Sequence, residues 1–496
     1  MSQSTVVSAP GKVLVAGGYL VLEPAFSGTV VSTSSRFYTV VTPKARKESQ
    51  KITVRSPQFL EATWTYDVGT GSPLEVTPAA HNTSKNKFVH LALRTVLSLA
   101  AGTKAPSHIQ ELLSTGINIT IVGDNDFYSQ SAKLASLNLP RTLKSLSQLP
   151  PFNPLNVHLA DVHKTGLGSS AALITALVSA LLLHFGLITE TTFADAASAD
   201  RRFAHNVAQY VHCLAQGKIG SGFDVAAAAF GTHIYTRFDP SVLKDLLSSD
   251  TPSSQTLYSV LSPSNPAWDY KVEPFKLPPL TRIMLADVNA GSDTPSLVGK
   301  VLSWRKANKE TSDKLWETLH QHNRSLATNL QLLTRLSEQD PENYASAVKY
   351  LASLQPVQWA ANPWQPPEEI PIVEKFYGAH RITQDIRQNM KRMGELAGVP
   401  IEPPEQTSLL DKCVTQAGII GGGVPGAGGY DAIWLLVCNP VDCSPELPPV
   451  ERVEYLWSKY DELKLSPLSA EESHAGGARK ENIDDIPGLK DIIVVV

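Results

Sequence analysis

The sequence lacks the features that mark several large protein classes. Only four cysteines occur, none in a CxxC pair, which disfavours both a disulfide framework and a common type of zinc site. No apolar run reaches the length of a membrane-spanning helix, and the N-terminus shows no signal-peptide pattern. The formal charge is −4, without a basic block suited to a nucleic-acid backbone. We therefore expect a cytoplasmic protein with no nucleic-acid or membrane partner.

Several catalytic motifs are also absent. The chain contains no GxxxxGK[ST], GxSxG or HExxH motif and no HRD…DFG pair, which argues against P-loop enzymes, serine hydrolases of the GxSxG type, zincins and protein kinases. Gly421, Gly423 and Gly426 match GxGxxG. A dinucleotide site requires that motif to follow a strand and open a helix. Here it follows an expected helix and precedes an expected strand, so we interpret it as backbone shaped to approach a ligand.

What the chain does contain is a Gly/Ser-rich stretch, Lys164 to Ala172, directly before an apolar run that ends at Phe185. The run is long enough for a helix of about four turns. A flexible loop at the positive end of a helix offers free N–H groups to an anion. An ordinary serine N-cap on a core helix is the alternative, and the stretch alone leaves both open.

Two further stretches carry isolated charges beside glycines. Lys12 follows Pro10-Gly11 between β-branched runs and suits either a phosphate contact or a strand end reaching solvent. Asp224 ends a glycine-rich turn and begins an alanine-rich segment, so it suits a helix cap, an active-site carboxylate, or both.

His205 and His212 share a helix face at a spacing unusual for metal ligands, which favours packing or surface roles.

The length of 496 residues allows two or three domains, and the alternation of hydrophobic patterns predicts a mixture of helices and strands. We expect an N-terminal domain over 1–240, a linker or insertion over 241–280, a second domain over 281–465 and a tail over 466–496. The last residues favour a short strand or a disordered end.

The hydrophobic patterns also predict the individual elements. Strands are predicted within 5–42, including 17–22, and at 117–122, 232–236, 282–288 and 432–437. Helices are predicted at 86–101, 171–185, 191–216, 296–308, 311–338, 341–354, 372–397 and 407–416.

The three glycine-bearing stretches together resemble the GHMP kinases in order and spacing. They are Pro10-Gly11-Lys12…Gly17-Gly18-Tyr19, Gly166-Leu-Gly-Ser-Ser-Ala-Ala172 and Gly423-Val-Pro-Gly-Ala-Gly-Gly429. The resemblance implies an α+β fold of two domains, the first like ribosomal protein S5 domain 2 and the second ferredoxin-like. Gly17-Gly18-Tyr19, Lys218–Asp224 and Ile401–Thr407 are most similar to the eukaryotic members that act on 5-phosphomevalonate.

That resemblance implies transfer of a phosphoryl group from ATP to 5-phosphomevalonate, with Mg²⁺, in isoprenoid and sterol-precursor synthesis. By the same resemblance Lys12 and Asp224 are catalytic, and Ser170 matches the serine on the magnesium side. Position 213, where mevalonate kinases have a magnesium-binding Glu, is Cys213. The implied ATP contacts are Thr165, Gly166, Leu167, Gly168, Ser169, Ser170 and Ala171; the candidate substrate contacts are Gly18, Tyr19, Lys164, Lys218, Ser221, Gly222, Ser292, Thr294, Gly426 and Gly428.

The acceptor in such a reaction is a phosphate monoester whose second pKa is about 6, so a general base has little to remove at neutral pH. We therefore expect Asp224 to act by orientation and electrostatics. ATP and the acceptor are both anions, so bringing them together requires positive charge. Lys164 and Lys218 are the first candidates, and Arg201 and Arg202 are weaker ones. The alternatives are another small-molecule kinase of the same family and a non-catalytic ligand sensor. We expect a monomer or a homodimer.

Overall fold

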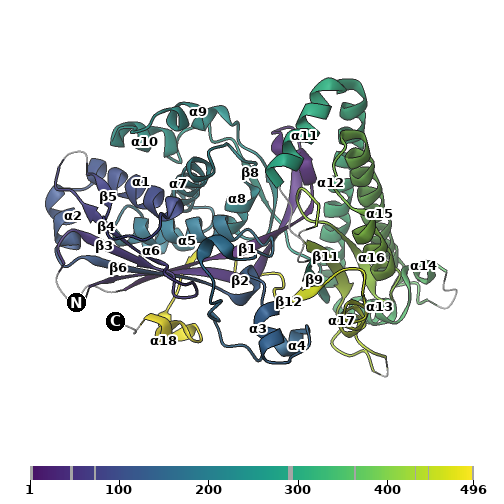
Figure 1. The fold of residues 1–496 in the computed structure, drawn as a ribbon. Helices are drawn as coiled ribbons and strands as arrows, with labels where there is room; N and C mark the ends of the chain where they lie inside the picture. The colour runs from purple at the N-terminus through teal and green to yellow at the C-terminus, as the bar shows by residue number, and fades with distance from the viewer. Residues whose placement is uncertain are drawn as a thin grey trace.

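The computed structural model describes residues 4–44, 48–71, 74–288, 294–361, 365–430, 432–444 and 446–493, with 294 and 295 described by their backbone only. Two sheets, one in each half of the chain, carry helices on their faces, and a long N-terminal hairpin reaches from the first half to the second (Figure 1). The expected α+β class is therefore confirmed. In the described part of the chain, no helix is both long and apolar enough to cross a membrane.

The first sheet is mostly antiparallel, and β-branched residues on its strands favour this pleated conformation. Its strands are β1 (Thr5–Ala16), β2 (Ser27–Pro43), β3 (Lys51–Arg55), β4 (Thr63–Val68), β5 (Val76–Pro78), β6 (Ile117–Gly123), β7 (His233–Thr236), β8 (Lys271–Pro274) and β13 (Arg479–Lys480). The order is β13-β1-β2-β6-β3-β4-β5, with β7 on β2 and β8 on β7. The pair β3–β6 is parallel.

One face of this sheet is covered by a layer of helices. The apolar run that follows the Gly/Ser-rich stretch forms the buried helix at the centre of this layer. A helix that is apolar all round must be buried on every side, and here its neighbours are the sheet and three helices. The helices of this layer are α1 (Lys87–Thr103), α2 (Pro106–Leu113), α5 (Ser169–His184), α6 (Glu190–Ala194), α7 (Ala199–Gln216), α8 (Phe223–Phe230), α9 (Ser241–Ser248) and α10 (Ser254–Leu261).

The other face buries Val6, Val40 and Val122 beneath Phe152 and Leu489. These strand residues alternate with neighbours that face the helices, as the two-residue period of a strand requires. The short elements at this side and at the sheet ends are α3 (Ser131–Ser136), α4 (Leu143–Leu146), η2 (Asn125–Phe127), η3 (Leu159–Asp161), η4 (Ile483–Asp485) and α18 (Leu489–Ile493).

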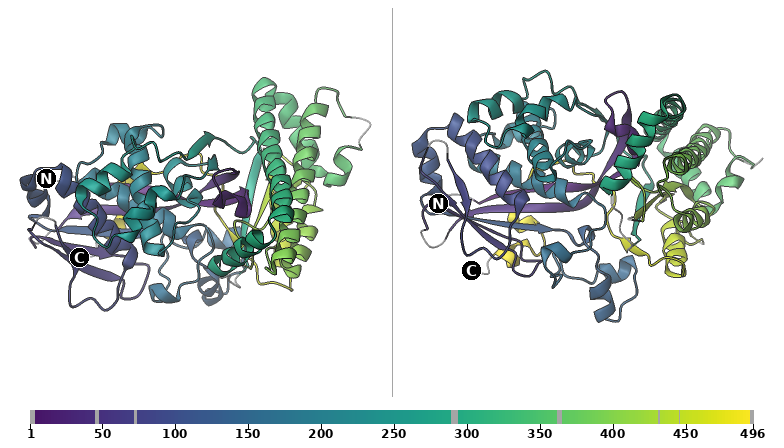
Figure 2. Two further views of the ribbon diagram at one scale, coloured as in Figure 1. Left: turned by 90° about the horizontal axis from the view of Figure 1, so that it is seen from above. Right: turned by 45° about the horizontal axis from the view of Figure 1, so that its top comes forward.

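The second sheet has the order β10-β11-β9-β12 and helices on both faces. Along β9, Ile283 and Leu285 belong to the core that includes the long helices, while Met284 and Ala286 pack with α16 and α17. Figure 2 shows α12 and α15 side by side. The elements are β9 (Thr281–Asp287), β10 (Ile419–Gly423), β11 (Ala432–Cys438), β12 (Ser466–Leu468), α11 (Thr294–Ala307), α12 (Lys309–Gln339), α13 (Pro341–Ser353), α14 (Pro356–Trp359), α15 (Ile370–Ala397), α16 (Pro404–Val414) and α17 (Pro449–Ser458).

The hairpin of β1 and β2 connects the two halves. Its tip is the short helix η1 (Gly18–Leu22), where the sequence predicted a strand. Tyr19 and Leu20 at this tip are buried among Trp316, Met390 and Met393 of the second half. In a helical turn, adjacent side chains such as these can pack against the same group of helices. In a strand they would point to opposite faces.

Three other segments differ from their predictions. The helix expected over 191–216 is two helices, α6 and α7, because Ser198 caps α7 by accepting from the Arg201 N–H. Residues 241–280, expected as a linker or insertion, do not form an extended linker, because they contain α9, α10 and β8, which pack on the first half. The C-terminal end forms α18 up to Ile493. The predicted helix and strand positions elsewhere agree with the structure within a few residues.

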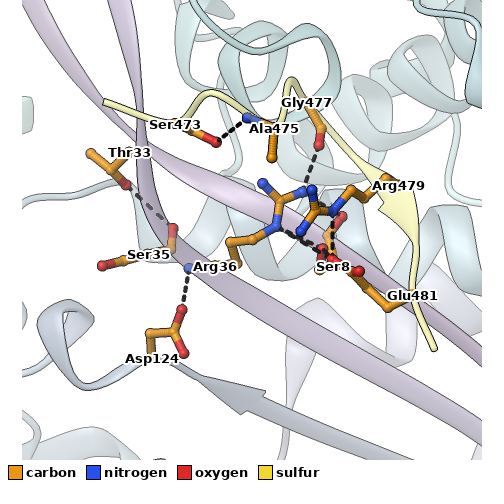
Figure 3. Close-up of polar contacts among 10 residues, drawn as sticks. All are labelled: Ser8, Thr33, Ser35, Arg36, Asp124, Ser473, Ala475, Gly477, Arg479 and Glu481. Atoms are coloured by element: carbon orange, nitrogen blue, oxygen red, sulfur yellow. Dashed lines mark hydrogen bonds and ion pairs between the residues drawn. The ribbon is translucent and has the colours of Figure 1, made fainter. Parts of the chain in front are cut away.

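The segment expected as a tail over 466–496 belongs to both sheets. Its β12 pairs with β9 of the second sheet, and its β13 pairs with β1 of the first. Figure 3 shows Arg36 of β2 between Ser8 of β1 and the C-terminal segment at Gly477 and Glu481. The Arg36 guanidinium donates to Ser8 Oγ at 2.7 Å and to the Gly477 carbonyl at 2.6 Å, and its Nε lies 3.8 Å from Glu481 Oε1. The C-terminal segment is thus an integral part of the fold.

Candidate active site

Lys12 of β1 is held against the Gly/Ser-rich loop by both its backbone and its side chain. Its N–H donates to the Leu167 carbonyl at 2.9 Å, and its Nζ donates to the Gly166 carbonyl at 2.9 Å. A register shift in the β1–β2 pairing lies between Pro10 and Lys12. Such irregularities re-aim side chains beside functional sites. The first two glycine-bearing stretches therefore meet at Lys12.

The loop leading to α5 is built rigidly on the segment beneath it. The Thr165 hydroxyl donates to the Asp126 carbonyl, and the Thr165 N–H donates to the Phe127 carbonyl at 3.3 Å. Thr165 is fully buried, and Leu167 nearly so. These two candidate ATP contacts therefore shape the loop, while Gly166, Gly168, Ser169 and Ser170 keep some exposure.

Two acids support this segment from behind, the buried Asp126 and the partly buried Asp124. Asp126 accepts hydrogen bonds from Ser35 Oγ at 2.7 Å and from the Ser469 N–H at 2.7 Å. Asp124 accepts from the Arg36 N–H at 2.7 Å. Burial raises the pKa of Asp124 to about 7. Removing these two carboxyl groups from water costs free energy, and hydrogen bonds to each of them offset part of that cost.

Helix α5 begins at Ser169, with Gly168 as its N-cap in the left-handed conformation at φ +77°. The predicted alternative of a serine cap is wrong, since no side chain caps this helix. The first N–H groups of a helix have no carbonyl of an earlier turn to donate to, and the helix dipole is positive there. Ser169, Ser170 and Ala171 thus place an anion site beside Lys12.

Ser170, His212 and Asp224 converge from three helices. His212 Nε2 of α7 lies 3.1 Å from Ser170 Oγ and 3.9 Å from Asp224 Oδ2 of α8. The Gln216 amide nitrogen is 3.1 Å from the same Nε2, and because an amide N–H can only donate, Nε2 acts as the acceptor, its one lone pair shared between Gln216 and Ser170. A Ser170 hydroxyl that donates to Nε2 keeps its oxygen lone pairs for a cation. The side chain of Asp224 is 23% exposed, so it can reach a ligand.

Sequence reasoning missed His212. His205 is a buried packing residue, its ring 4.5 Å from that of Tyr270, as predicted. His212 faces the site through its contact with Ser170, whereas its neighbour Cys213 does not. The Cys213 thiol points into the core, where it accepts from the Gln209 amide at 3.1 Å and burial raises its pKa.

The turn before α8 is held by two residues of the first sheet. Arg237 donates to the Gly220 carbonyl at 2.7 Å and also to the Leu22 carbonyl of η1, while the Tyr235 hydroxyl donates to the Ser221 carbonyl at 3.0 Å. Gly222 is the N-cap of α8. Asp224 consequently lies in the first turn of α8, where its Oδ1 accepts from the Val225 N–H at 3.0 Å.

The first and third glycine-bearing stretches also meet. The Tyr19 hydroxyl donates to the Ala427 carbonyl at 2.8 Å, and burial raises the pKa of Tyr19. Tyr19 therefore connects the two halves, and its hydroxyl hydrogen is engaged in this hydrogen bond. A Cβ on Gly428 would lie 2.1 Å from the Ile401 carbonyl oxygen, at φ +76°, so this glycine is required by the chain's own backbone. Gly18 and Gly426 are partly exposed beside this contact.

The candidate cations for the acceptor are less well placed. Lys164 and Lys218 are exposed, and their side chains make no polar contact within the described residues. Arg201 is buried, and its guanidinium donates to the Phe193 and Ala229 carbonyls, so it supports backbone. Ser292 lies outside the described residues, as does the side chain of Thr294.

Comparison with known proteins shows the family to which the chain is similar. The family model described as "GHMP kinases N terminal domain" matches residues 143–232, which include the loop, α5, α7 and α8. The peroxisomal phosphomevalonate kinase of Arabidopsis thaliana is 36% identical, with 95% of each chain covered. The phosphomevalonate kinase of Candida albicans is 35% identical, covering 92% of this chain and 95% of the relative.

The chain belongs to the phosphomevalonate kinase family. Among solved structures, Streptococcus pneumoniae phosphomevalonate kinase in complex with phosphomevalonate and AMPPNP is similar with a TM-score of 0.56 and 15% identity, covering 94% of this chain and 99% of that chain. At that identity the likeness supports the fold, and it confirms the expected GHMP kinase architecture.

Proposed function

We propose that this protein transfers the γ-phosphoryl group of ATP to 5-phosphomevalonate, giving ADP and 5-diphosphomevalonate, in isoprenoid and sterol-precursor synthesis. The observation that carries the proposal is Lys12 Nζ beside the N-terminus of α5, in a chain 36% identical to a phosphomevalonate kinase. A phosphate oxygen of the acceptor attacks the γ-phosphorus. The bond from that phosphorus to the bridging oxygen of ADP breaks, and ADP leaves with the electron pair.

The residues divide between positioning and charge neutralisation, which dominate phosphoryl transfer. The N–H groups at Ser169–Ala171 bind phosphate oxygens of ATP. Lys12, released from the Gly166 carbonyl, neutralises charge that develops between donor and acceptor. Asp224 orients Lys12 and the acceptor, since the acceptor phosphate is already mostly ionised at neutral pH.

A magnesium ion fits the donor set. Ser170 Oγ and Asp224 Oδ2 both lie around His212 Nε2, and Mg²⁺ commonly completes its shell with water and phosphate oxygens. No group of three or more His, Cys, Asp or Glu side chains within the described residues could hold a metal alone, so we expect the ion to arrive with ATP. When bound, it would neutralise charge on the phosphates. His212 is then a positioning residue that holds the Ser170 hydroxyl.

A coupled ADP-release assay with 5-phosphomevalonate, mevalonate and galactose tests the proposal. We expect 5-phosphomevalonate to be used with a kcat/KM at least about a hundredfold above the other two, because a site built for a phosphate leaves charges unpaired without it. Preferential use of mevalonate or galactose would make the protein another small-molecule kinase. No turnover with any acceptor, despite ATP binding, would make it a ligand sensor.

The location and assembly of the protein remain proposals. All four cysteines are unpaired, which supports a reducing compartment, and we propose the cytoplasm. The Arabidopsis relative is named peroxisomal, so imaging of a fluorescent fusion beside a peroxisomal marker distinguishes the two. We propose a monomer or a homodimer, which light scattering would determine.

A further inference from the structure

A groove of about 930 Å³ lies between the two halves, away from the catalytic residues. Its walls are the β7–β8 ribbon and the second half of α12, and its floor includes the chain around 230–232 and 472–476. Helix α8 separates it from the active site, because Asp224 lies in the first turn of that helix and Phe230 is its last residue. The volume is in the range of small-molecule sites.

The walls combine aromatic surface with cations. Phe230, Tyr270 and Phe275 contribute rings, and Arg202 and Arg335 contribute guanidinium groups from α7 and α12. Lys276, directly after Phe275, adds a third cation. Within the described part of the chain these three cations make no hydrogen bond and no ion pair within 4 Å. Burial raises the pKa of the Glu472 carboxyl, and Lys276 is nevertheless close enough to lower that pKa in part. Burial likewise raises the pKa of Tyr270, which Arg202 lowers in part. The groove also contains Glu338 and Glu472, but Glu472 already accepts from the Leu277 N–H at 3.2 Å.

A buried polar atom in the wall also lacks a partner. His233 is 1% exposed, and its Nδ1 lies 2.7 Å from the Gly231 carbonyl, to which it must donate. Its Nε2 is therefore an acceptor, and it has no hydrogen-bond partner in the structure. The Tyr270 hydroxyl is likewise buried without a partner. Such atoms are rare in folded proteins and are usually satisfied by a ligand or water.

We propose that this groove binds a small organic anion, with a phosphate or carboxylate group at Arg202, Lys276 and Arg335 and an apolar or aromatic body against Phe230 and Phe275. The groove is a second site, separate from the ATP and acceptor sites, and its walls come from both halves of the chain.

The probe for this site is 1-anilinonaphthalene-8-sulfonate, an aromatic anion whose fluorescence reports binding. It is titrated into the full-length protein with saturating AMPPNP, Mg²⁺ and 5-phosphomevalonate, which block the catalytic site. We expect saturable binding that weakens about tenfold or more in Lys276→Ala/Arg335→Ala, since each lost charged contact is of that order. Arg324→Ala, also an exposed cation of α12 but outside the groove, should bind as the wild type does.

An uncharged relative of the probe, N-phenyl-1-naphthylamine, tests the role of the anion. It should bind the wild type at least about tenfold more weakly than the sulfonate and should not distinguish the variants. The proposal is overturned if the sulfonate shows no saturable binding, if the double variant binds it as tightly as the wild type, or if Arg324→Ala weakens it equally. Kinase activity of the double variant should stay near wild type, which separates this test from that of the proposed function.

Discussion

The donor and acceptor sides that we propose for the active site are held in different ways. The loop on the donor side is fixed within the first half of the chain, by Lys12, by the Asp126 and Phe127 carbonyls and by the start of α5. The acceptor side depends on long-range ties. Tyr19 reaches Ala427, 408 positions along the chain, and Arg237 joins η1 to the turn before α8.

This difference indicates a division of labour. The donor loop is held by contacts within the first half, with Ser469 of the C-terminal segment as a further support beneath Asp126. An acceptor site built across the halves depends on how they pack, because the tip of the β1–β2 hairpin is buried among α11, α12 and α15. We therefore expect changes in the donor loop to impair ATP use, and changes in the ties to impair acceptor use.

Lys12 lies at the boundary of the two sides, and its loss should have the largest effect. Lys12→Met should lower kcat by about 10³, because it removes the charge that stabilises the transition state. Steady-state kinetics measures this, with thermal unfolding as a check of the fold. Lys85→Met, the same change at an exposed position, should be neutral. Near-normal turnover in Lys12→Met would contradict the assigned role.

Gly168 tests the donor loop itself. A Cβ there would lie 3.0 Å from Lys12 Cε at φ +77°, so Gly168→Ala should strain the loop and displace Lys12, lowering kcat by about 10². Gly217→Ala imposes similar strain at φ +70° with nothing within 4 Å of the added carbon. Both should be destabilised by about 1 kcal/mol. Equal kinetic damage in the two variants would mean that strain alone matters.

His212 tests the magnesium side. His212→Phe keeps a ring but removes the contact with Ser170 Oγ, so the half-saturating Mg²⁺ concentration should rise about tenfold, as for other residues that orient metal ligands. Calorimetric titration of AMPPNP at several Mg²⁺ concentrations gives a second readout without turnover. His205→Phe, on the same helix but away from Ser170, should leave the Mg²⁺ dependence unchanged. A shift common to both variants would refute the positioning role.

The prediction with the smallest effect on activity concerns Asp124, which lies behind the donor loop. Its ionisation should change the pH dependence of protein stability. Burial raises its pKa to about 7 from an ordinary value of 3.8, so the unfolded state loses its proton first as pH rises. The contribution of Asp124 to stability is therefore present at low pH and is lost between about pH 4 and 7. Asp124→Asn cannot ionise and should gain on the order of 2 kcal/mol relative to wild type over that window.

Urea unfolding at pH 5 and pH 7.5 measures this difference. The exposed Asp161→Asn makes the same chemical change at the surface and should follow the wild type at both pH values. If the free energy of unfolding of Asp124→Asn runs parallel to that of wild type, Asp124 does not take up a proton on folding.

The sequence was most informative where function depends on backbone. The loop before α5 and Lys12 were found because glycine and serine at a helix start leave few other structures open. Periodicity located most helices and strands in the same way. These features are local, so one stretch of chain contains the information.

What the sequence missed depends on distant contacts. The helical conformation of η1 follows from burial of Tyr19 and Leu20 among helices that lie some 300 positions along the chain. The C-terminal segment resembled a tail because its strands, β12 and β13, are short and each needs a partner from another part of the chain. His212 faces Ser170 through the packing of α7 on α5, which no local pattern encodes.

The most direct test of this division is to measure binding of the two ligands separately. AMPPNP with Mg²⁺ and 5-phosphomevalonate are each titrated by calorimetry into Gly168→Ala and into Tyr19→Phe, which loses the hydrogen bond to Ala427. We predict a crossed result: Gly168→Ala weakens AMPPNP about tenfold and spares 5-phosphomevalonate, whereas Tyr19→Phe weakens 5-phosphomevalonate about fivefold and spares AMPPNP. Loss of the same ligand in both variants would contradict a donor side and an acceptor side that are built independently.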